Sequence, residues 1–523
     1  MRLRTERVVD ADRLPDILAP RTGFVRELPP PSVPGSPPTA GRGAATERQE
    51  RGGGGEAAAF ELRDGPVRDY RRMVEVEPLP DQPSRVRVRQ TVEATLAAPL
   101  FWWFFWLPAR LDLGRLGRPH HSPFWAPPQR LDTRAATALD ALAGAALVTG
   151  YLGTVLTQTF TFAANEFGVD KGGQGLSLAI VRADVVVALV LVAMADRRGR
   201  RGLLLFSAAA GTVLTATGAL APSVGGLVAS QVVARGFVTA AGVLIGIVAV
   251  EEMPAGSRAY AVSLLTMAGA LGAGVCVMSL PLADVAERAW RVLYVVPLVG
   301  LPVLVSVARH LPESKRFGRP HRDVALAGHG KRLWLLATST FLLALFTVPA
   351  SQFQNEFLRD ERGFSAARIS LFTVLTATPA SIGIVVGGRL ADVRGRRLVG
   401  AIGILGGVGF TVAMFASHGW PLWGWSVVAS VIGGATVPAL GVYGPELFPT
   451  SLRGKANGLI FTLGRVGSIV GLVAVGVLSD RFGTLPPAFA LMALGPLALA
   501  VLILVAYPET AGRELEELNP EDA

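Results

Sequence analysis

The sequence predicts an all-α integral membrane protein whose twelve transmembrane helices form two related halves of six. Three observations lead to this fold class. Half of the 523 residues are hydrophobic and only 17% are charged, whereas soluble domains contain about 25% charged residues. Twelve apolar runs follow one another from residue 136 onward, and a short motif of acidic and basic residues occurs twice, 196 positions apart.

Each apolar run is long enough to cross a hydrocarbon layer of about 30 Å as an α-helix. The runs divide the chain into an N-terminal half over 136–311, a central loop over 312–331, a C-terminal half over 332–507 and a tail over 508–523. We expect the spans at 138–163, 174–195, 201–221, 224–249, 258–281, 290–310, 332–355, 368–391, 397–417, 420–443, 455–479 and 485–507.

The residues before the first span are polar, and we expect 1–95 to be a largely disordered tail. Residues 28–55 are rich in proline, glycine and serine, a composition typical of disorder. Residues 74–90 alternate apolar and charged residues, which is a weak signal for a β-hairpin.

The segment 96–130 contains the aromatic run "PLFWWFFWLP" at 99–108. This run is too short to cross a bilayer, and tryptophan favours the headgroup boundary. We therefore expect an interfacial segment on the cytoplasmic surface. A lid buried against the transmembrane body is the alternative.

Basic residues alternate between the two ends of the spans. The loops after spans 2, 6, 8 and 10 are rich in arginine and lysine, whereas 221–224 and 417–420 contain neither. The positive-inside rule then predicts a multi-pass plasma-membrane protein with both termini, the central loop and the C-terminal tail in the cytoplasm. Because the basic residues lie between apolar runs rather than on one soluble face, we expect no nucleic-acid partner.

No residue pattern indicates a cofactor, a metal or catalysis. The single cysteine, Cys276, cannot form an intrachain disulfide, and His120 and His121 have no third metal ligand nearby in the sequence. The chain contains no G-x-x-x-x-G-K-[ST] phosphate loop, so we expect no ATP hydrolysis. We also expect that the protein is not an enzyme.

Three pairs of motifs share one offset of 195 or 196 residues. "DRRGRR" at 196–201 pairs with "DVRGRR" at 392–397, and "LPES" at 311–314 pairs with "YPET" at 507–510. The spacing E-x-x-P-x-x-x-R occurs at 251–258 and again at 446–453. Since the offset spans six helices, the chain consists of two related halves.

The motifs resemble those of the major facilitator superfamily of transporters, which is built from two six-helix halves. "MADRRGRR" (194–201) and "GRLADVRGRR" (388–397) are similar to the paired loop motifs of that superfamily. "PELFPTSLRG" (445–454), "LPESKRF" (311–317), "PETAGRELEEL" (508–518) and "GRVGSIVG" (464–471) resemble its sugar-porter and metabolite:proton symporter branches. The resemblance covers residues 136–518.

The resemblance implies secondary transport of a small organic solute by alternating access, with proton-coupled symport as the expected mode. A drug or metabolite efflux carrier is one alternative, although residues 264–277 lack the glycine–proline box of drug:proton antiporters. A transporter-like sensor that signals through its N-terminal tail is the other. Val192 departs from the superfamily pattern, which has glycine at that position.

The duplicated motifs suggest a cytoplasmic gate, because an aspartate at a helix end can pair with arginines from a neighbouring helix. The alternative is that these arginines only set the topology. The gating candidates are Asp196, Gly199, Arg200, Arg201, Glu251, Arg258, Gly388, Asp392, Gly395, Arg396, Arg397, Glu446 and Arg453.

Four charged residues inside the spans have no charged counterpart in the other half: Arg182, Asp184, Arg235 and Arg465. Asp184 lies twelve residues from Asp196, which places it about 18 Å from the helix end. A charge at that depth is costly unless it is paired or hydrated, so it marks a functional site by default. Buried structural pairs are the alternative. On a continuous helix Arg182 and Asp184 are about 200° apart and face different surroundings.

The excess of arginine favours an anionic solute held between Arg235 and Arg465, because arginine binds carboxylates bidentately. The alternative is a neutral polyol or sugar. Asp184 is the candidate for proton coupling, and further binding candidates are Gln158, Gln352 and Asn355. The expected partners are thus a small solute, a proton and the lipid bilayer.

Overall fold

The computed structural model describes residues 1–28, 56–80, 82, 84–116, 123, 125–169, 177, 180–279, 282–283, 286–314, 326–364 and 366–520. The stretch predicted to be disordered, 28–55, lies outside the described residues except for Leu28. The chain forms two compact units, Met1–Ala141 and Leu142–Ala523.

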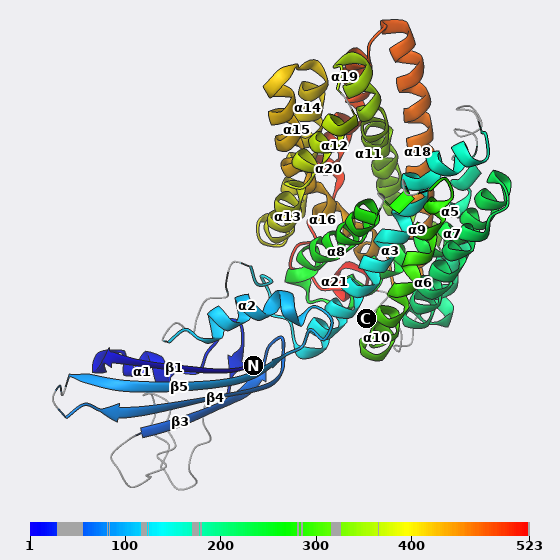
Figure 1. Ribbon diagram of the computed structural model, residues 1–523. Helices are drawn as coiled ribbons and strands as arrows, with labels where there is room; N and C mark the ends of the chain where they lie inside the picture. The colour runs from blue at the N-terminus through cyan, green and yellow to red at the C-terminus, as the bar shows by residue number, and fades with distance from the viewer. Residues whose placement is uncertain are drawn as a thin grey trace. The chain divides into compact units, whose positions relative to one another are not determined.

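The N-terminal unit contains a five-stranded antiparallel sheet in the order β1-β5-β4-β3-β2 (Figure 1). The sheet corrects the prediction that residues 1–95 are largely disordered. One short helix, one longer helix and a 3₁₀ turn accompany the strands. The elements are β1 (Arg2–Asp10), α1 (Leu14–Leu18), β2 (Arg26–Glu27), β3 (Glu56–Asp64), β4 (Val67–Pro78), β5 (Arg85–Leu96) and α2 (Trp102–Leu113), with a 3₁₀ turn at Ala11–Arg13.

Apolar and polar residues alternate along these strands, which explains why the average composition did not predict them. Val74, Val88 and Val92 are fully buried on one face of the sheet, and the neighbouring Glu75, Arg89 and Glu93 are charged and exposed on the other face. When hydrophobicity is averaged over a window of residues, such a strand has a polar mean value. The alternation of apolar and polar residues, with a period of two, is nevertheless typical of a half-buried strand. The weak hairpin signal at 74–90 was correct, since β4 and β5 pair with Val76 opposite Val88.

The open face of the sheet carries ion pairs between neighbouring strands. Arg89 contacts Glu6 of β1 and Glu77 of β4, and Arg2 contacts Glu93 at 3.0 Å. These pairs are exposed, so each contributes little to stability. They keep like charges from facing each other on adjacent strands.

The buried face contains a carboxylate that is fully paired. Arg72 donates to both oxygens of Glu27 at 2.8 and 2.7 Å, and Tyr70 donates its hydroxyl at 2.5 Å. Burial raises the pKa of Tyr70 well above its usual value, so the hydroxyl keeps its proton and remains a donor. Arg72 also donates to the Ile17 carbonyl at 2.9 Å, which ties β4 to α1.

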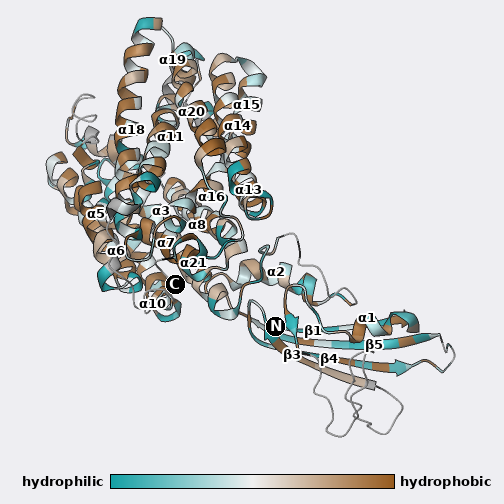
Figure 2. Ribbon diagram, turned by 180° about the vertical axis from the view of Figure 1, so that it is seen from behind, coloured by the Kyte–Doolittle hydropathy of each residue, from teal (hydrophilic) through white to brown (hydrophobic). Residues whose placement is uncertain are grey.

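The second unit is helical and mostly apolar (Figure 2). Its N-terminal half contains the continuation of α3 (Thr133–Glu166) and α5 (Asp184–Arg198), α6 (Arg200–Thr217), α7 (Val224–Glu252), α8 (Arg258–Ser279), α9 (Val292–Val295) and α10 (Leu301–His310). Its C-terminal half contains α11 (Gly330–Glu356), α12 (Ala366–Ala377), α13 (Ala380–Arg394), α14 (Arg396–Ala416), α15 (Gly419–Gly434), α16 (Thr436–Gly441), α17 (Tyr443–Glu446), α18 (Arg453–Phe482), α19 (Leu485–Met492), α20 (Leu494–Ala506) and α21 (Leu515–Leu518).

These helices agree with the predicted spans. Within the described residues, eleven helical segments are long and apolar enough to cross a membrane. The second predicted span is represented by a shorter apolar helix, Asp184–Ala195, because most of 170–179 lies outside the described residues. The all-α membrane fold is therefore confirmed for this unit.

The turns of the duplicated motif have the same backbone conformation in both halves. Gly199 has φ 98° and ψ 144°, and Gly395 has φ 103° and ψ 141°. A positive φ of this kind strains residues with a side chain, which explains why both copies contain glycine. Each glycine ends one helix and starts the next, between α5 and α6 and between α13 and α14.

A row of glycines brings α18 against α11. A Cβ atom on Gly467 would lie 2.5 Å from the Phe341 carbonyl oxygen, and one on Gly471 would lie 2.2 Å from that of Leu345. Small residues permit such backbone approach in membrane helices. The "GRVGSIVG" run thus packs one face of α18 within the C-terminal half and leaves Arg465 on another.

We predict that Arg72→Ala destabilises the N-terminal unit by about 3–5 kcal/mol, because it leaves the Glu27 carboxylate buried without its cation. Hydrogen–deuterium exchange of the β4 and β5 amides in the full chain measures this loss. Arg89→Ala, which removes an exposed arginine from β5, is the matched control and should leave the exchange unchanged. Equal protection in the two variants would contradict the prediction.

Candidate functional site

The two halves are joined at one end of the helices by buried arginines and glutamates, which we call the arginine network: Arg200, Glu251, Arg258, Asp392, Arg396, Glu446 and Arg453. Glu251, at the end of α7, accepts hydrogen bonds from Arg200 of its own half and from Arg453 of the other half. Its second oxygen accepts from Ser314 at 2.6 Å. Arg200 also donates to the Thr450 carbonyl across the boundary at 2.6 Å.

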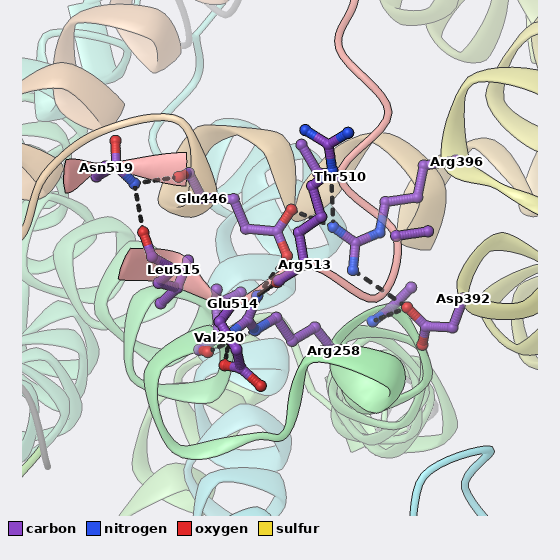
Figure 3. Close-up of polar contacts among 12 residues, drawn as sticks. Val250, Arg258, Asp392, Arg396, Glu446, Thr510, Arg513, Glu514, Leu515 and Asn519 are labelled. Atoms are coloured by element: carbon purple, nitrogen blue, oxygen red, sulfur yellow. Dashed lines mark hydrogen bonds and ion pairs between the residues drawn. The ribbon is translucent and has the colours of Figure 1, made fainter. Parts of the chain in front are cut away.

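Glu446 repeats this arrangement in the second half (Figure 3). It accepts from Arg396 of its own half and from Arg258 of the other half, the latter at 3.3 Å. Arg396 donates further to Thr510 at 2.8 Å, and Arg258 donates to the Arg513 carbonyl at 3.0 Å. The pairing is therefore pseudo-symmetric, and each half supplies one glutamate that binds an arginine from each side.

Asp392 caps a helix of the opposite half. Its two oxygens accept from the backbone amides of Ala259 at 3.3 Å and Tyr260 at 3.0 Å, in the first turn of α8. It also accepts from Arg396 at 3.2 Å. A carboxylate at a helix N-terminus satisfies free amides and complements the helix dipole.

Gly388 makes the approach of α13 to α8 possible. A Cβ atom there would lie 1.9 Å from Ser263 Oγ, and that hydroxyl donates to the Ile384 carbonyl at 2.9 Å. The first half has the buried Val192 at the corresponding position. The side chain of Asp196, the counterpart of Asp392, is outside the described part of the structure.

A second layer of acids supports the duplicated turns. Glu313 accepts from the amides of Arg200 and Arg201, at 3.2 and 3.1 Å. Glu509 accepts in the same way from the amides of Arg396 and Arg397, at 3.0 and 3.2 Å. The sequence interpretation did not assign Glu313 or Glu509 to the site, although the "LPES" and "YPET" repeats contained the signal.

Asp184, which is 1% exposed, pairs with one of the other three intramembrane charges. Its Oδ2 atom accepts from Thr239 at 3.1 Å and from Arg465 of the other half at 3.4 Å. Its Oδ1 atom is buried and has no hydrogen-bond partner among the described residues. Arg465 also stacks over Phe461, 5.0 Å from the ring centre.

The other two arginines lie within electrostatic range of this pair. Arg235 donates to the Gly153 carbonyl at 3.1 Å, and it interacts with the charges of Asp184, Arg182 and Arg465. Arg182 interacts with Arg465 and Asp184. Among the described residues, Arg465 is thus the arginine that pairs directly with Asp184.

The expectation that Arg182 and Asp184 face different surroundings stays a prediction. Residues 182–183 form a turn and α5 begins at Asp184. Arg182 is half-buried, whereas Asp184 is 1% exposed and pairs with Arg465.

Thr239 and Gly236 are parts of this site that the sequence interpretation missed. A Cβ atom on Gly236 would lie 2.4 Å from Val187 Cβ and 3.0 Å from the Asp184 carbonyl oxygen. The glycine therefore lets α7 approach α5 closely enough for Thr239 to reach Asp184. In the sequence, Gly236 directly follows the intramembrane Arg235, and this glycine was the signal that could have indicated a close helix contact here.

The remaining binding candidates are not brought into this cluster by any described contact. Gln158 is half-buried on α3 and Gln352 is exposed near the end of α11. The side chain of Asn355 lies outside the described residues, as do His120 and His121. In the part of the chain that the structure describes, no three histidine, cysteine, aspartate or glutamate side chains group as metal ligands do.

Comparison with known proteins gives agreement in sequence and in fold. Residues 333–522 match the family model of the Major Facilitator Superfamily. The chain is 27% identical over 259 residues to a probable 4-methylmuconolactone transporter of Cupriavidus pinatubonensis, covering 45% of this chain and 58% of the relative. It is 25% identical over 215 residues to a cis,cis-muconate transport protein of Acinetobacter baylyi, covering 37% and 51%. The matched region therefore spans little more than half the length of these curated relatives.

Two solved structures share the fold. The proton:xylose symporter XylE superposes with a TM-score of 0.61 at 16% identity, covering 74% of this chain and 99% of that one. The human organic anion transporter MFSD10 gives a TM-score of 0.59 at 14% identity, covering 71% and 99%. At these identities the likeness establishes the fold alone.

We predict that Asp392→Asn shifts the chain toward states in which the two halves separate at the arginine network. A lost hydrogen bond to a charged group costs about 1.5–3 kcal/mol, so the separated population should rise roughly 10- to 150-fold. Spin labels at Arg198→Cys and Arg394→Cys, which are exposed at the ends of α5 and α13, measure the distance between the halves. Glu93→Gln in the N-terminal sheet is the control, and an unchanged distance distribution in Asp392→Asn would refute the prediction.

Proposed function

The chain belongs to the major facilitator superfamily, and from this membership we propose that it is a secondary transporter that carries a small organic anion together with a proton. The observation that carries the proposal is the ion pair between Asp184 and Arg465, which joins the two halves at 3.4 Å inside the membrane unit. Arg182 and Arg235 add positive charge around it.

An anion would complete the charge of this cluster. Three arginines and one aspartate leave an excess of positive charge, and each uncompensated charge at the centre of a bilayer costs at least about 2.5–3.5 kcal/mol. The guanidinium groups offer paired donors that match a carboxylate. Two relatives support this class of solute, because muconate is a dicarboxylate and methylmuconolactone carries one carboxylate.

Competition for Arg465 would link anion binding to proton binding. In the described state Arg465 contributes to neutralising Asp184. A carboxylate that takes Arg465 leaves the aspartate buried with less positive charge beside it, and uptake of one proton removes the resulting cost. By reciprocity, a protonated Asp184 frees Arg465 for the anion. Such linkage is what symport of an anion and a proton requires.

The arginine network would act as the gate of an alternating-access cycle. It joins the two halves through Glu251 with Arg453, Glu446 with Arg258, and Asp392 with the first turn of α8. The positive-inside rule assigns this end to the cytoplasm. The described state would then be closed to the cytoplasm, and solute would be released there only after these pairs separate.

A second candidate function is that of a sensor, which the folded N-terminal unit favours. Purified protein in liposomes separates the two possibilities, because a carrier exchanges solute across the bilayer without any other protein. Counterflow of labelled cis,cis-muconate is the first probe, followed by other mono- and dicarboxylates and by neutral polyols. Flux of polyols with no carboxylate flux would overturn the anion assignment.

We predict that Arg465→Gln weakens binding of cis,cis-muconate roughly 10- to 150-fold, the equivalent of one charged hydrogen bond of about 1.5–3 kcal/mol. Arg465→Lys should lose less, because lysine keeps the charge but not the paired donors. Arg481→Gln, an exposed position on the same helix, is the control for calorimetric titration. Equal affinity in all these proteins would exclude Arg465 from the binding site.

We predict that Asp184→Asn keeps exchange of the anion but abolishes its accumulation against a gradient. The amide imitates the protonated carboxyl and retains an acceptor for Thr239, yet it cannot release a proton. Proteoliposomes with an imposed pH gradient measure accumulation, and Glu287→Gln, exposed in the loop before α9, is the control. Accumulation at the level of the unmodified protein would show that Asp184 does not couple the proton.

A further inference from the structure

The helix α2 exposes a row of large apolar side chains. Trp103 and Leu111 are each 60% exposed, and Phe104 and Leu107 are each 54% exposed. Positions 103, 104, 107 and 111 follow the spacing of one helix face. The opposite face, with Ala109 and Leu113 fully buried, packs on the core of the N-terminal sheet. The exposed row therefore lacks a partner within its own unit.

The start of α2 is fixed to α3, the helix that becomes the first transmembrane span. The buried Asp140 accepts hydrogen bonds from the backbone amides of Leu100 at 2.8 Å and Phe101 at 2.9 Å. Thr137 donates to the Ala97 carbonyl at 3.2 Å, and Thr133 donates to the Val67 carbonyl at 2.8 Å. All these groups belong to the unit Met1–Ala141. We call Thr133, Thr137 and Asp140 the clamp residues, and their spacing places them on one face of α3.

The clamp sets the depth at which α2 begins. The apolar part of α3 runs over 28 residues, Thr133–Phe160, which is about 42 Å of helix. A hydrocarbon core is about 30 Å thick, so roughly 12 Å of this helix must lie in the interfacial regions. Asp140 lies seven residues, about 10 Å, from the start. When the excess length lies at the N-terminal end of α3, residues 100 and 101 would be held near the boundary between headgroups and hydrocarbon.

The composition of the exposed row suits that boundary. Tryptophan concentrates at the headgroup level, and in-plane helices combine aromatic and leucine side chains with basic residues. Arg110 lies on the same exposed face and stacks over Trp106 at 5.0 Å, so its charged end can reach the headgroups. A second protein would need a matching apolar surface, whereas the bilayer is continuous with the span that holds α2.

We propose that α2 is an in-plane membrane helix whose row Trp103, Phe104, Leu107 and Leu111 inserts into the bilayer interface, at a depth fixed by Asp140. The partner of this surface is the lipid bilayer itself. The N-terminal sheet would thus be attached both to the first transmembrane helix and to the membrane surface. This attachment goes beyond transport and does not depend on the solute.

The test measures what surrounds the row in the complete protein. Leu107→Cys and Leu111→Cys carry a spin label in proteoliposomes, and the label's collisions with lipid-soluble oxygen and with a water-soluble nickel chelate are compared. Met73→Cys, on the open face of the sheet and 40% exposed, is the matched control. The unmodified chain, whose single cysteine Cys276 is buried, gives the background.

Insertion predicts that labels at 107 and 111 collide at least several-fold more with oxygen than with the chelate, and that the label at 73 shows the reverse. A label at 107 that behaves like the one at 73 would show that the row faces water. A label protected from both reagents would show that protein covers the row, either another part of this chain or a second copy. Either result would overturn the proposal.

A second variant tests the depth control. Asp140→Ala removes both acceptors for the Leu100 and Phe101 amides but leaves the apolar row intact. The label at 107 should remain in lipid, while its oxygen-to-chelate ratio changes and its mobility rises. An unchanged ratio and mobility would show that Asp140 does not set the position of α2.

Discussion

Arginine–carboxylate pairs that cross the boundary between the two halves are the interaction on which the membrane unit depends. At the arginine network, side chains that are almost fully withdrawn from water meet in groups, and Glu251 and Glu446 each hold an arginine from both halves. A buried charge without a partner is strongly destabilising. The two halves are therefore held together at this end, because separating them would leave buried charges without partners.

Asp184 and Arg465 also form a buried ion pair between the two halves, but this pair is less completely satisfied than those of the arginine network. At the network, the glutamates have both oxygens occupied, whereas Asp184 has one oxygen without a partner among the described residues and a longer contact to its arginine. The network also consists of duplicated residues, and the intramembrane cluster does not. The carboxylate oxygen without a described partner and the longer contact are the two features of the cluster on which the proposed exchange of counter-charge depends.

The N-terminal unit includes the first residues of α3, which bind its sheet directly. Thr133, Thr137 and Asp140 lie on one face of α3 and bind the backbone of the sheet and of the segment before α2. Because their partners are backbone groups, the attachment depends on strand and turn geometry rather than on particular side chains.

The sequence by itself determined the number and order of the spans, the two-fold repeat and most of the arginine network, because hydrophobic length and a constant offset are local, one-dimensional properties. It also identified Asp184, Arg235 and Arg465, since a charge inside an apolar run is visible without a structure. Only the tertiary structure decided which charges meet. Arg465 of the other half pairs with Asp184, Gly236 lets Thr239 reach it, and Glu313 and Glu509 bind the duplicated turns. The N-terminal sheet escaped the sequence interpretation for a related reason: its strands bury every second residue, and their partners lie far apart in the chain, so neither average composition nor local spacing reveals the pairing.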